Sequence, residues 1–167
     1  MRRLTAVLFL LFLMVMACGG SAELPAGATS TPEPPALPPD AQPAEVLTII
    51  DGDTIDVEIA GAEYRLRYIG IDTPEREMPY YEEATQANRD LVEGRTVYLV
   101  KDVSETDRYG RLLRYVYLSD GTFVNAELVR SGYAQAVTFP PDVAFAETFR
   151  QHQQEARDAG RGLWAQP

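Results

Sequence analysis

The chain has 167 residues, a length that favours one domain with extensions over two full domains. Hydrophobic residues make up 46% of the sequence and charged residues 24%, which excludes a wholly disordered protein. The 25 acidic and 15 basic residues give a formal net charge of -10. This charge argues against a protein that coats DNA by bulk positive charge, but it leaves room for a small local phosphate site. The single cysteine, Cys18, excludes an internal disulfide.

The N-terminus has the three-part build of an export signal. Two arginines follow Met1, and the apolar run Leu4–Ala17 is too short to cross a bilayer as a helix. The segment Val15-Met16-Ala17-Cys18 is similar to a bacterial lipobox, in which the cysteine is lipidated. We therefore expect residues 1–17 to be a lipoprotein signal peptide and Cys18 to anchor the protein to a membrane of the cell envelope, facing outside the cytoplasm. An ordinary signal peptide cut nearby is the alternative.

Residues 18–44 are rich in proline, alanine and glycine. Prolines lack a backbone donor, so we expect a semi-rigid tether of polyproline character with neither helix nor strand. The globular domain is expected to span residues 45–167.

The first half of this domain reads mainly as strands. Residues 46–50 and 54–59 predict two strands joined at Asp51-Gly52, a favoured hairpin dipeptide. A third strand is expected over residues 64–71, and the spacing of apolar residues predicts a helix over residues 80–92.

The second half adds two strands, over residues 96–101 and 112–118, and a short helix over residues 124–131. A last helix has Phe145, Phe149, His152 and Ala156 spaced for burial, and Asp142 is expected to cap it. Five short strands with helices among them predict an α+β fold, a small five-stranded β-barrel packed against about three α-helices.

Three acidic side chains stand near predicted strand ends. Asp53 opens a strand otherwise rich in β-branched residues, and Pro74 holds Asp72 and Glu75 in an extended segment. Such carboxylates would repel one another without a cation, and Ca²⁺ suits oxygen ligands in irregular geometry. The spacing alone leaves two interpretations open, a metal site and solvated acids at turns.

Two arginines point to phosphate chemistry. Arg67 lies in a predicted strand, and Arg111 follows a turn that starts at Asp107. Strict alternation would put Arg67 and Asp72 on opposite faces, so a shared site requires the strand to bulge or end near Gly70. An ordinary ion pair at the rim of the sheet is the alternative for Arg67. Paired guanidiniums, a cation and a carboxylate are the parts that phosphodiester hydrolysis requires.

Several motifs follow one another in a fixed order along the domain. They are Asp51-Gly52-Asp53-Thr54, then Arg67 with Ile71-Asp72-Thr73-Pro74-Glu75, then Asp107-Arg108-Tyr109-Gly110-Arg111, and finally Val124-Asn125 with Gly132-Tyr133-Ala134. Together they resemble the staphylococcal-nuclease-like (thermonuclease) family, over residues 46–164. The resemblance implies an oligonucleotide/oligosaccharide-binding (OB) type of barrel. It also implies Ca²⁺-dependent cleavage of DNA and RNA to 3′-phosphate products.

The resemblance implies a metal site built from four residues. Asp53 and Asp72 would bind Ca²⁺ through their carboxylates, and Thr73 through its backbone carbonyl. Asp51 would support this site without binding the metal itself.

The resemblance also implies the groups that act on the substrate. Glu75 would be the general base or would position the attacking water. Arg67 and Arg111 would hold the scissile phosphate and stabilise the transition state, and Tyr109 would contact the nucleotide.

The chain departs from the family pattern where the nucleotide is bound. In the best-known member a lysine-rich loop and a downstream tyrosine pair help binding, whereas this chain has a single lysine and Thr138-Phe139-Pro140 at the tyrosine positions. Two other functions stand beside a nuclease: a barrel that binds nucleic acid or another polyanion without cutting it, and a structural Ca²⁺ module. Retention of Glu75, Arg67 and Arg111 favours the nuclease. We expect a monomer with no protein partner.

Overall fold

Five strands close into a barrel in the computed structural model, which describes residues 37–165. Three α-helices accompany the barrel, so the predicted α+β fold is confirmed. Among the helices of residues 37–165, none is both long and apolar enough to cross a membrane. The predicted signal peptide, the lipidation site at Cys18 and most of the predicted tether lie outside the described residues.

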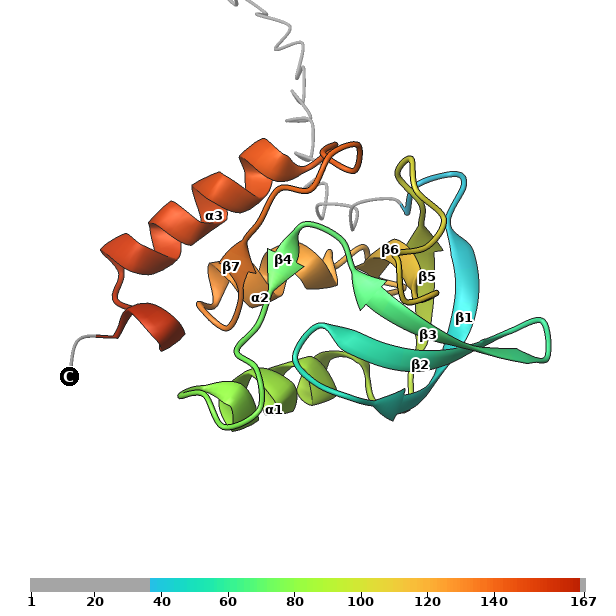
Figure 1. Cartoon of the computed structure of the whole chain (residues 1–167), viewed down its shortest axis with the longest axis horizontal. Helices are drawn as coiled ribbons and strands as arrows, with labels where there is room; N and C mark the ends of the chain where they lie inside the picture. The colour runs from blue at the N-terminus through green and yellow to red at the C-terminus, as the bar shows by residue number, and fades with distance from the viewer. Residues whose placement is uncertain (1–36, 166–167) are drawn as a thin grey trace, which may run out of the picture. The chain divides into compact units, whose positions relative to one another are not determined.

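The barrel has the strand order β1-β2-β3-β6-β5, with β5 pairing back onto β1 (Figure 1). All of these pairings are antiparallel except that of β3 with β6, which is parallel. Alternate side chains along the strands point inward, and Ile55, Val57 and Leu66 are fully buried in the barrel. The barrel strands are β1 (Gln42–Ile49), β2 (Thr54–Ile59), β3 (Ala62–Tyr68), β5 (Thr96–Val100) and β6 (Leu112–Tyr117).

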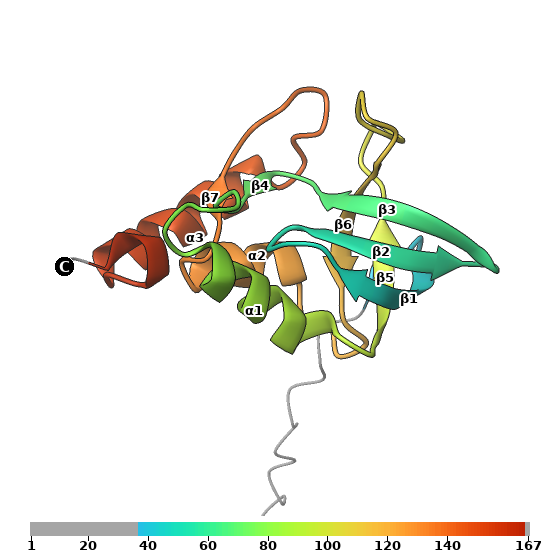
Figure 2. The ribbon, with the colours of Figure 1, turned by 60° about the horizontal axis from the view of Figure 1, so that its bottom comes forward.

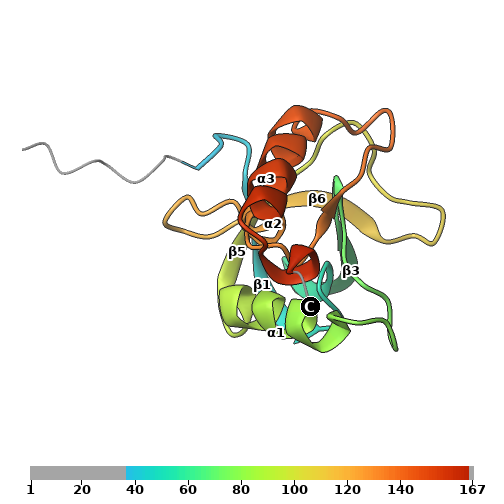
Figure 3. The same ribbon diagram turned by 90° about the vertical axis from the view of Figure 1, so that its left-hand side faces the viewer.

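The helices gather on one side of the barrel, on the left in Figure 1. Helix α3 packs on α2, as Figure 3 shows. A separate two-stranded sheet joins β4 to β7 and so attaches the segment that carries Asp72 beside α3. These elements are α1 (Tyr81–Val92), α2 (Val124–Arg130), α3 (Ala146–Asp158), β4 (Ile71–Asp72), β7 (Gln135–Ala136) and the short 3₁₀ helix η1 (Gly162–Trp164).

An aromatic cluster fastens α3 to the barrel. Tyr115 of β6 meets Phe145 edge to face, with ring centroids 4.7 Å apart, and Phe123 lies 4.9 Å from Phe145. Phe149 is fully buried, as its spacing in the predicted helix required. Edge-to-face contacts of this kind are favourable beyond the area that they bury.

Strand β1 begins earlier than its sequence pattern indicated. It starts at Gln42 and includes Pro43, within the segment expected to be a tether without regular structure. The first residues of β1 pair with β5 alone, because pairing with β2 starts only at Glu45. A proline that cannot donate is tolerated where a strand has a neighbour on one side only.

The prediction that Asp142 caps the last helix is wrong. Helix α3 starts at Ala146, and the residue at its N-cap, Phe145, makes no side-chain cap hydrogen bond. The Asp142 carboxylate instead accepts hydrogen bonds from the backbone N–H groups of Val103 (2.9 Å) and Ser104 (2.8 Å). Asp142 thus bonds to a segment that is distant in sequence and does not cap α3.

The strand predicted over residues 64–71 ends early, at Tyr68. Gly70 follows with a φ of 76°, a backbone conformation that favours glycine. A Cβ atom at Gly70 would lie 2.5 Å from the ring of Phe149. The chain therefore turns at Gly70, as a shared site for Arg67 and Asp72 required.

Substitution of Gly70 tests this packing. Gly70→Ala is expected to lower the free energy of unfolding by about 2–4 kcal/mol, because the methyl group adds a clash with Phe149 to the backbone strain. Gly61→Ala is the matched control, since Gly61 also has a positive φ (82°) but a Cβ atom there would have no neighbouring atom within 4 Å. The control should lose only about 1–2 kcal/mol in denaturant unfolding. Equal losses in the two variants would rule out the close contact with Phe149.

Candidate active site

The turn between β1 and β2 places Asp53 inside the protein. The backbone N–H of Asp51 donates to the carbonyl of Thr54 (3.2 Å), and the Asp51 carboxylate accepts from the N–H of Asp53 (3.1 Å). Gly52 lies against Thr73, since a Cβ at Gly52 would come within 2.8 Å of that side chain. Asp53 is therefore only 3% exposed, although it follows a turn.

Several donors surround the Asp53 carboxylate. Its Oδ2 accepts hydrogen bonds from the backbone N–H (2.8 Å) and the hydroxyl (2.9 Å) of Thr73, and Nη1 of Arg67 lies 2.5 Å away. Burial raises the pKa of Asp53 to about 7, although Arg67 and the bonds from Thr73 act in the opposite direction. A further positive charge at this carboxylate would favour its ionised form.

Arg67 joins two acidic residues, Asp53 of the β1–β2 turn and Asp72 after the turn at Gly70. Its Nη2 donates to Oδ1 of Asp72 (2.7 Å), while its Nη1 is paired with Asp53. The Arg67 side chain is only 16% exposed. Arg67 thus forms ion pairs, as the alternative interpretation of its position held, but the pair with Asp53 is largely buried, whereas the Asp72 side chain is 51% exposed.

The oxygen atoms of Asp53, Asp72 and Thr73 suit a hard divalent cation such as Ca²⁺. The expected gathering of three carboxylates, with Glu75 as the third, is absent. Within residues 37–165, no three acidic, histidine or cysteine side chains are grouped closely enough to hold a metal ion. Arg67 lies between Asp53 and Asp72 and pairs with both carboxylates, and its single positive charge can balance only one of their two negative charges.

Arg111 is fixed by the turn that precedes β6. Oδ1 of Asp107 accepts from the backbone N–H groups of Tyr109 (2.9 Å) and Arg111 (3.0 Å), and Oδ2 accepts from Nε of Arg111 (2.7 Å). Burial acts to raise the pKa of Asp107, but the hydrogen bonds from Arg111 and Tyr109 outweigh it and lower that pKa. Asp107 therefore orients Arg111 while it leaves part of the guanidinium free to donate elsewhere.

Tyr109 stands at the tip of this turn and is 68% exposed. The guanidinium carbon of Arg108 lies 4.7 Å from the centre of its ring, and that of Arg111 lies 5.5 Å away. Cation–π contacts with two arginines hold the ring in place before any ligand arrives.

One cavity of about 560 Å³ brings the predicted residues together. Its lining includes Arg67, Asp72, Glu75, Tyr109 and Arg111, which come from three separate segments of the chain. The other predicted site residues, Asp51, Asp53 and Thr73, are not part of the lining, and Asp53 connects to the cavity through Arg67.

Glu75 is exposed at this cavity. Its backbone carbonyl accepts from the N–H of Met78 (2.9 Å), which closes a turn after Pro74. Among residues 37–165 no hydrogen-bond or ion-pair partner of the Glu75 carboxylate is found, so the group is available to a water molecule or a ligand.

Two supporting residues escaped prediction as parts of the site. The sequence pattern indicates Asp107 only as the start of a turn. Asn88 of α1 is fully buried, accepts from the Tyr68 hydroxyl (2.9 Å) and donates to the backbone carbonyl of Asp51 (2.9 Å). Asn88 thereby ties α1 to the turn that presents Asp53. Its polar amide on an otherwise buried helix face was the available signal.

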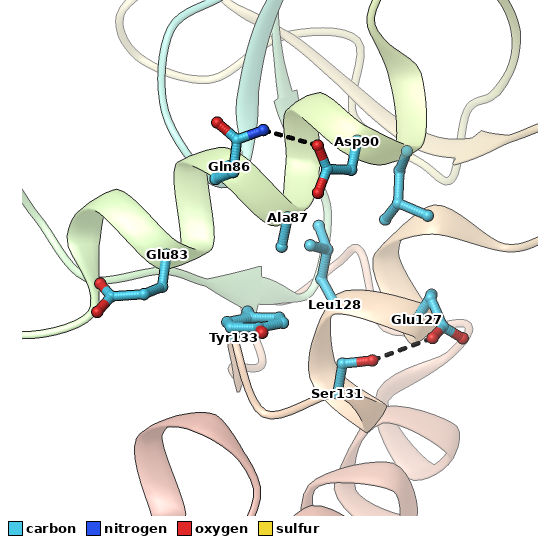
Figure 4. A pocket seen from close by; sticks show the side chains of 9 residues that line it. Glu83, Gln86, Ala87, Asp90, Glu127, Leu128, Ser131 and Tyr133 are labelled. Carbon is cyan, nitrogen blue, oxygen red and sulfur yellow. Dashed lines mark hydrogen bonds between the residues drawn. The ribbon is translucent and has the colours of Figure 1, made fainter.

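A second cavity, of about 390 Å³, lies between α1 and α2 (Figure 4). Three acidic residues, Glu83, Asp90 and Glu127, line it together with apolar side chains, and it has no arginine or lysine in its lining. An anionic ligand would be repelled there, whereas the first cavity offers Arg67, Arg108 and Arg111. Of these two cavities, the first, which combines arginines with acidic residues, is therefore the better candidate for an anionic ligand.

Comparison with known proteins identifies the family of this chain. The family model described as "Staphylococcal nuclease homologue" matches residues 65–166. The thermonuclease of Staphylococcus hyicus is 36% identical over 130 residues, which cover 74% of this chain and 76% of that protein.

Two further relatives are not named thermonuclease. Endonuclease YncB of Bacillus subtilis (strain 168) is 37% identical over 124 residues, or 70% of this chain and 58% of that protein. Protein ParB of Escherichia coli is 40% identical over 131 residues, or 74% of this chain and 72% of that protein. The resemblance drawn from the motifs is thus confirmed, and the chain belongs to the staphylococcal nuclease family.

Proposed function

We propose that this protein is a Ca²⁺-dependent endonuclease that hydrolyses phosphodiester bonds of DNA and RNA and leaves 3′-phosphate products. The observation that carries the proposal is the convergence of Arg67, Arg111 and Glu75 on one cavity. Membership of a family in which relatives are named thermonuclease and endonuclease supports the same hydrolase class. A barrel that only binds nucleic acid would have no need of a carboxylate that shares a cavity with two arginines and has no partner within residues 37–165.

The arginines are the groups that meet the phosphate. A guanidinium can donate two parallel hydrogen bonds to phosphate oxygens, and it stabilises the extra negative charge of the pentacoordinate transition state. Arg111 keeps its orientation through Asp107 during this step, and the exposed ring of Tyr109 offers a face for a nucleotide.

Glu75 acts as the general base that positions the attacking water. Its partner-free carboxylate accepts a hydrogen bond from a water molecule, orients it towards phosphorus and takes its proton as the oxygen attacks. The bond between phosphorus and the 5′ oxygen breaks, this oxygen takes a proton from solvent water and leaves as a 5′-hydroxyl, and the phosphate stays on the 3′ side.

Asp53, Asp72 and the carbonyl of Thr73 would hold the Ca²⁺ ion. When bound, the ion supplies positive charge that lowers the cost of charge build-up on the phosphate. Asp51 keeps the Asp53 turn closed through the hydrogen bond from the N–H of Asp53, and Asn88 holds that turn against α1.

We also propose that the enzyme acts as a monomer on a membrane outside the cytoplasm, held by lipid at Cys18. The support is the sequence pattern Val15-Met16-Ala17-Cys18 after a short apolar run. Burial of acyl chains contributes about 0.8 kcal/mol per CH₂, so two chains suffice for stable attachment.

Incubation of the domain with DNA tests the reaction. Cleavage is expected with Ca²⁺ and should stop when a chelator removes it. Glu75→Gln should lower kcat by about 10²–10⁴-fold, because the amide cannot accept the proton of the attacking water. Binding of DNA without cleavage under saturating Ca²⁺ would instead support a non-cutting polyanion-binding module. Full activity in chelator would rule out the metal.

Substitution of Arg111 tests transition-state stabilisation. Arg111→Lys keeps the charge but removes the planar fork, and kcat is expected to fall by about 10²–10³-fold. Arg130→Lys on α2 is the matched control, because Arg130 pairs with Glu127 and does not line the cavity. An Arg111→Lys enzyme as active as this control would remove Arg111 from the mechanism.

Substitution of Cys18 tests the anchor. The wild-type protein is expected in the membrane fraction of the cells that make it, and mass spectrometry should find acyl chains on Cys18. Cys18→Ser should abolish the acyl modification and shift the protein out of the membrane fraction. An unmodified Cys18 in exported wild-type protein would contradict the proposal.

A further inference from the structure

Two loops border the candidate active-site cavity, and hydrogen bonds join them to each other. The β5–β6 loop (residues 101–111) carries Tyr109 and Arg111, and the β7–α3 loop (residues 137–145) carries Phe139. Figure 2 shows the two loops rising side by side from the domain. The bonds between them are made by one aspartate from each loop.

Asp142 reaches from the β7–α3 loop to the β5–β6 loop. It is 7% exposed, and its Oδ1 accepts from the backbone N–H groups of Val103 (2.9 Å) and Ser104 (2.8 Å). Burial acts to raise the pKa of Asp142, but the bonds from Ser104 and Val103 outweigh it and lower that pKa. The bonds are therefore charge-assisted, which makes them stronger than bonds between neutral groups.

Asp102 reaches in the opposite direction. Its Oδ2 accepts from the backbone N–H of Ala144 (3.0 Å) and from the hydroxyl of Tyr115 (2.9 Å). The Tyr115 ring is buried in the aromatic cluster between β6 and α3. The pair of loops is thus fastened to the rigid part of the domain as well as to each other.

The joined loops present two aromatic rings to the cavity. Tyr109 is 68% exposed and Phe139 is 69% exposed, and both line the cavity together with Asp142. Exposed aromatic faces beside a phosphate-binding site suit unpaired bases, because each of the bases has a flat face that can stack on an aromatic ring. The distance between the two loops then decides whether one nucleotide can contact both rings.

We propose that Asp102 and Asp142 are positioning residues that set the width of the cavity between the Tyr109 loop and the Phe139 loop, for an unpaired nucleotide next to the scissile phosphate. The proposal rests on the proposed nuclease function and specifies that an unpaired nucleotide of the substrate contacts these loops. Asp107 holds Arg111 and Tyr109 together within one turn, so Asp102 and Asp142 act on the position of the Phe139 loop relative to this turn. The aspartates therefore affect substrate binding more than the chemical step.

Asp102→Asn and Asp142→Asn test the proposal with two substrates. For a single-stranded oligonucleotide, each variant is expected to raise KM by about tenfold while kcat stays within about twofold. For the small diester bis(4-nitrophenyl) phosphate, which is too short to contact both loops, kcat/KM should stay within about twofold. The double variant should lose less than the product of the two single effects, because both aspartates act on the same gap.

Asp120→Asn is the matched control. Asp120 also accepts a backbone hydrogen bond, from Thr122 (2.9 Å), but it lies in a turn that does not line the cavity. Its variant should match the wild type on both substrates. Equal losses on the oligonucleotide and the small diester, or an unchanged KM for the oligonucleotide, would overturn the proposal.

Failure of the nuclease function itself would look different. A wild-type protein that cleaves neither substrate would contradict the proposed function, and fluorescence anisotropy of a labelled oligonucleotide would still test the loops. Affinity about tenfold weaker in Asp142→Asn than in the wild type would support the positioning role. Equal affinity would overturn it.

Discussion

The site depends on the ion pairs of Arg67 with Asp53 and Asp72. A carboxylate as buried as that of Asp53 is costly to ionise, and the guanidinium at 2.5 Å, together with two hydrogen bonds from Thr73, offsets part of that cost. The same guanidinium holds the exposed Asp72 at 2.7 Å. One side chain of a barrel strand therefore sets the positions of both proposed metal-binding carboxylates.

Much of the surrounding structure serves this arrangement. The end of β3 and the turn at Gly70 bring Asp72 back towards Arg67, and pairing of β4 with β7 secures the returning segment. Asn88 fixes the Asp53 turn from the side of α1. The second half of the site is built independently, since Asp107 organises Arg111 and Tyr109 through bonds within a single turn.

Local patterns in the sequence were enough to predict the five barrel strands, the three α-helices and the need for a break near Gly70, but not the short strands β4 and β7. They could not reveal long-range polar contacts, because hydrogen bonds between distant residues leave no periodic signal. Asp142 illustrates this, since it stands where a helix cap is expected but bonds to Val103 and Ser104 instead. Pro43 illustrates a second limit, because its place in β1 depends on which neighbours the strand has there. Within residues 37–165 the three carboxylates of Asp53, Asp72 and Glu75 do not form one group. The sequence did not indicate that Arg67 would pair with two of them.

The parallel pairing of β3 with β6 determines when the site forms during folding. Arg67 pairs across the sheet with Leu113, two residues after Arg111, although α1 and β5 separate the two strands along the chain. The two arginines are therefore brought to the same cavity only when this non-local contact has formed. If the chain crosses a membrane unfolded, as the proposed signal peptide implies, the proposed catalytic groups would not yet form a site that could damage the nucleic acids of the producing cell.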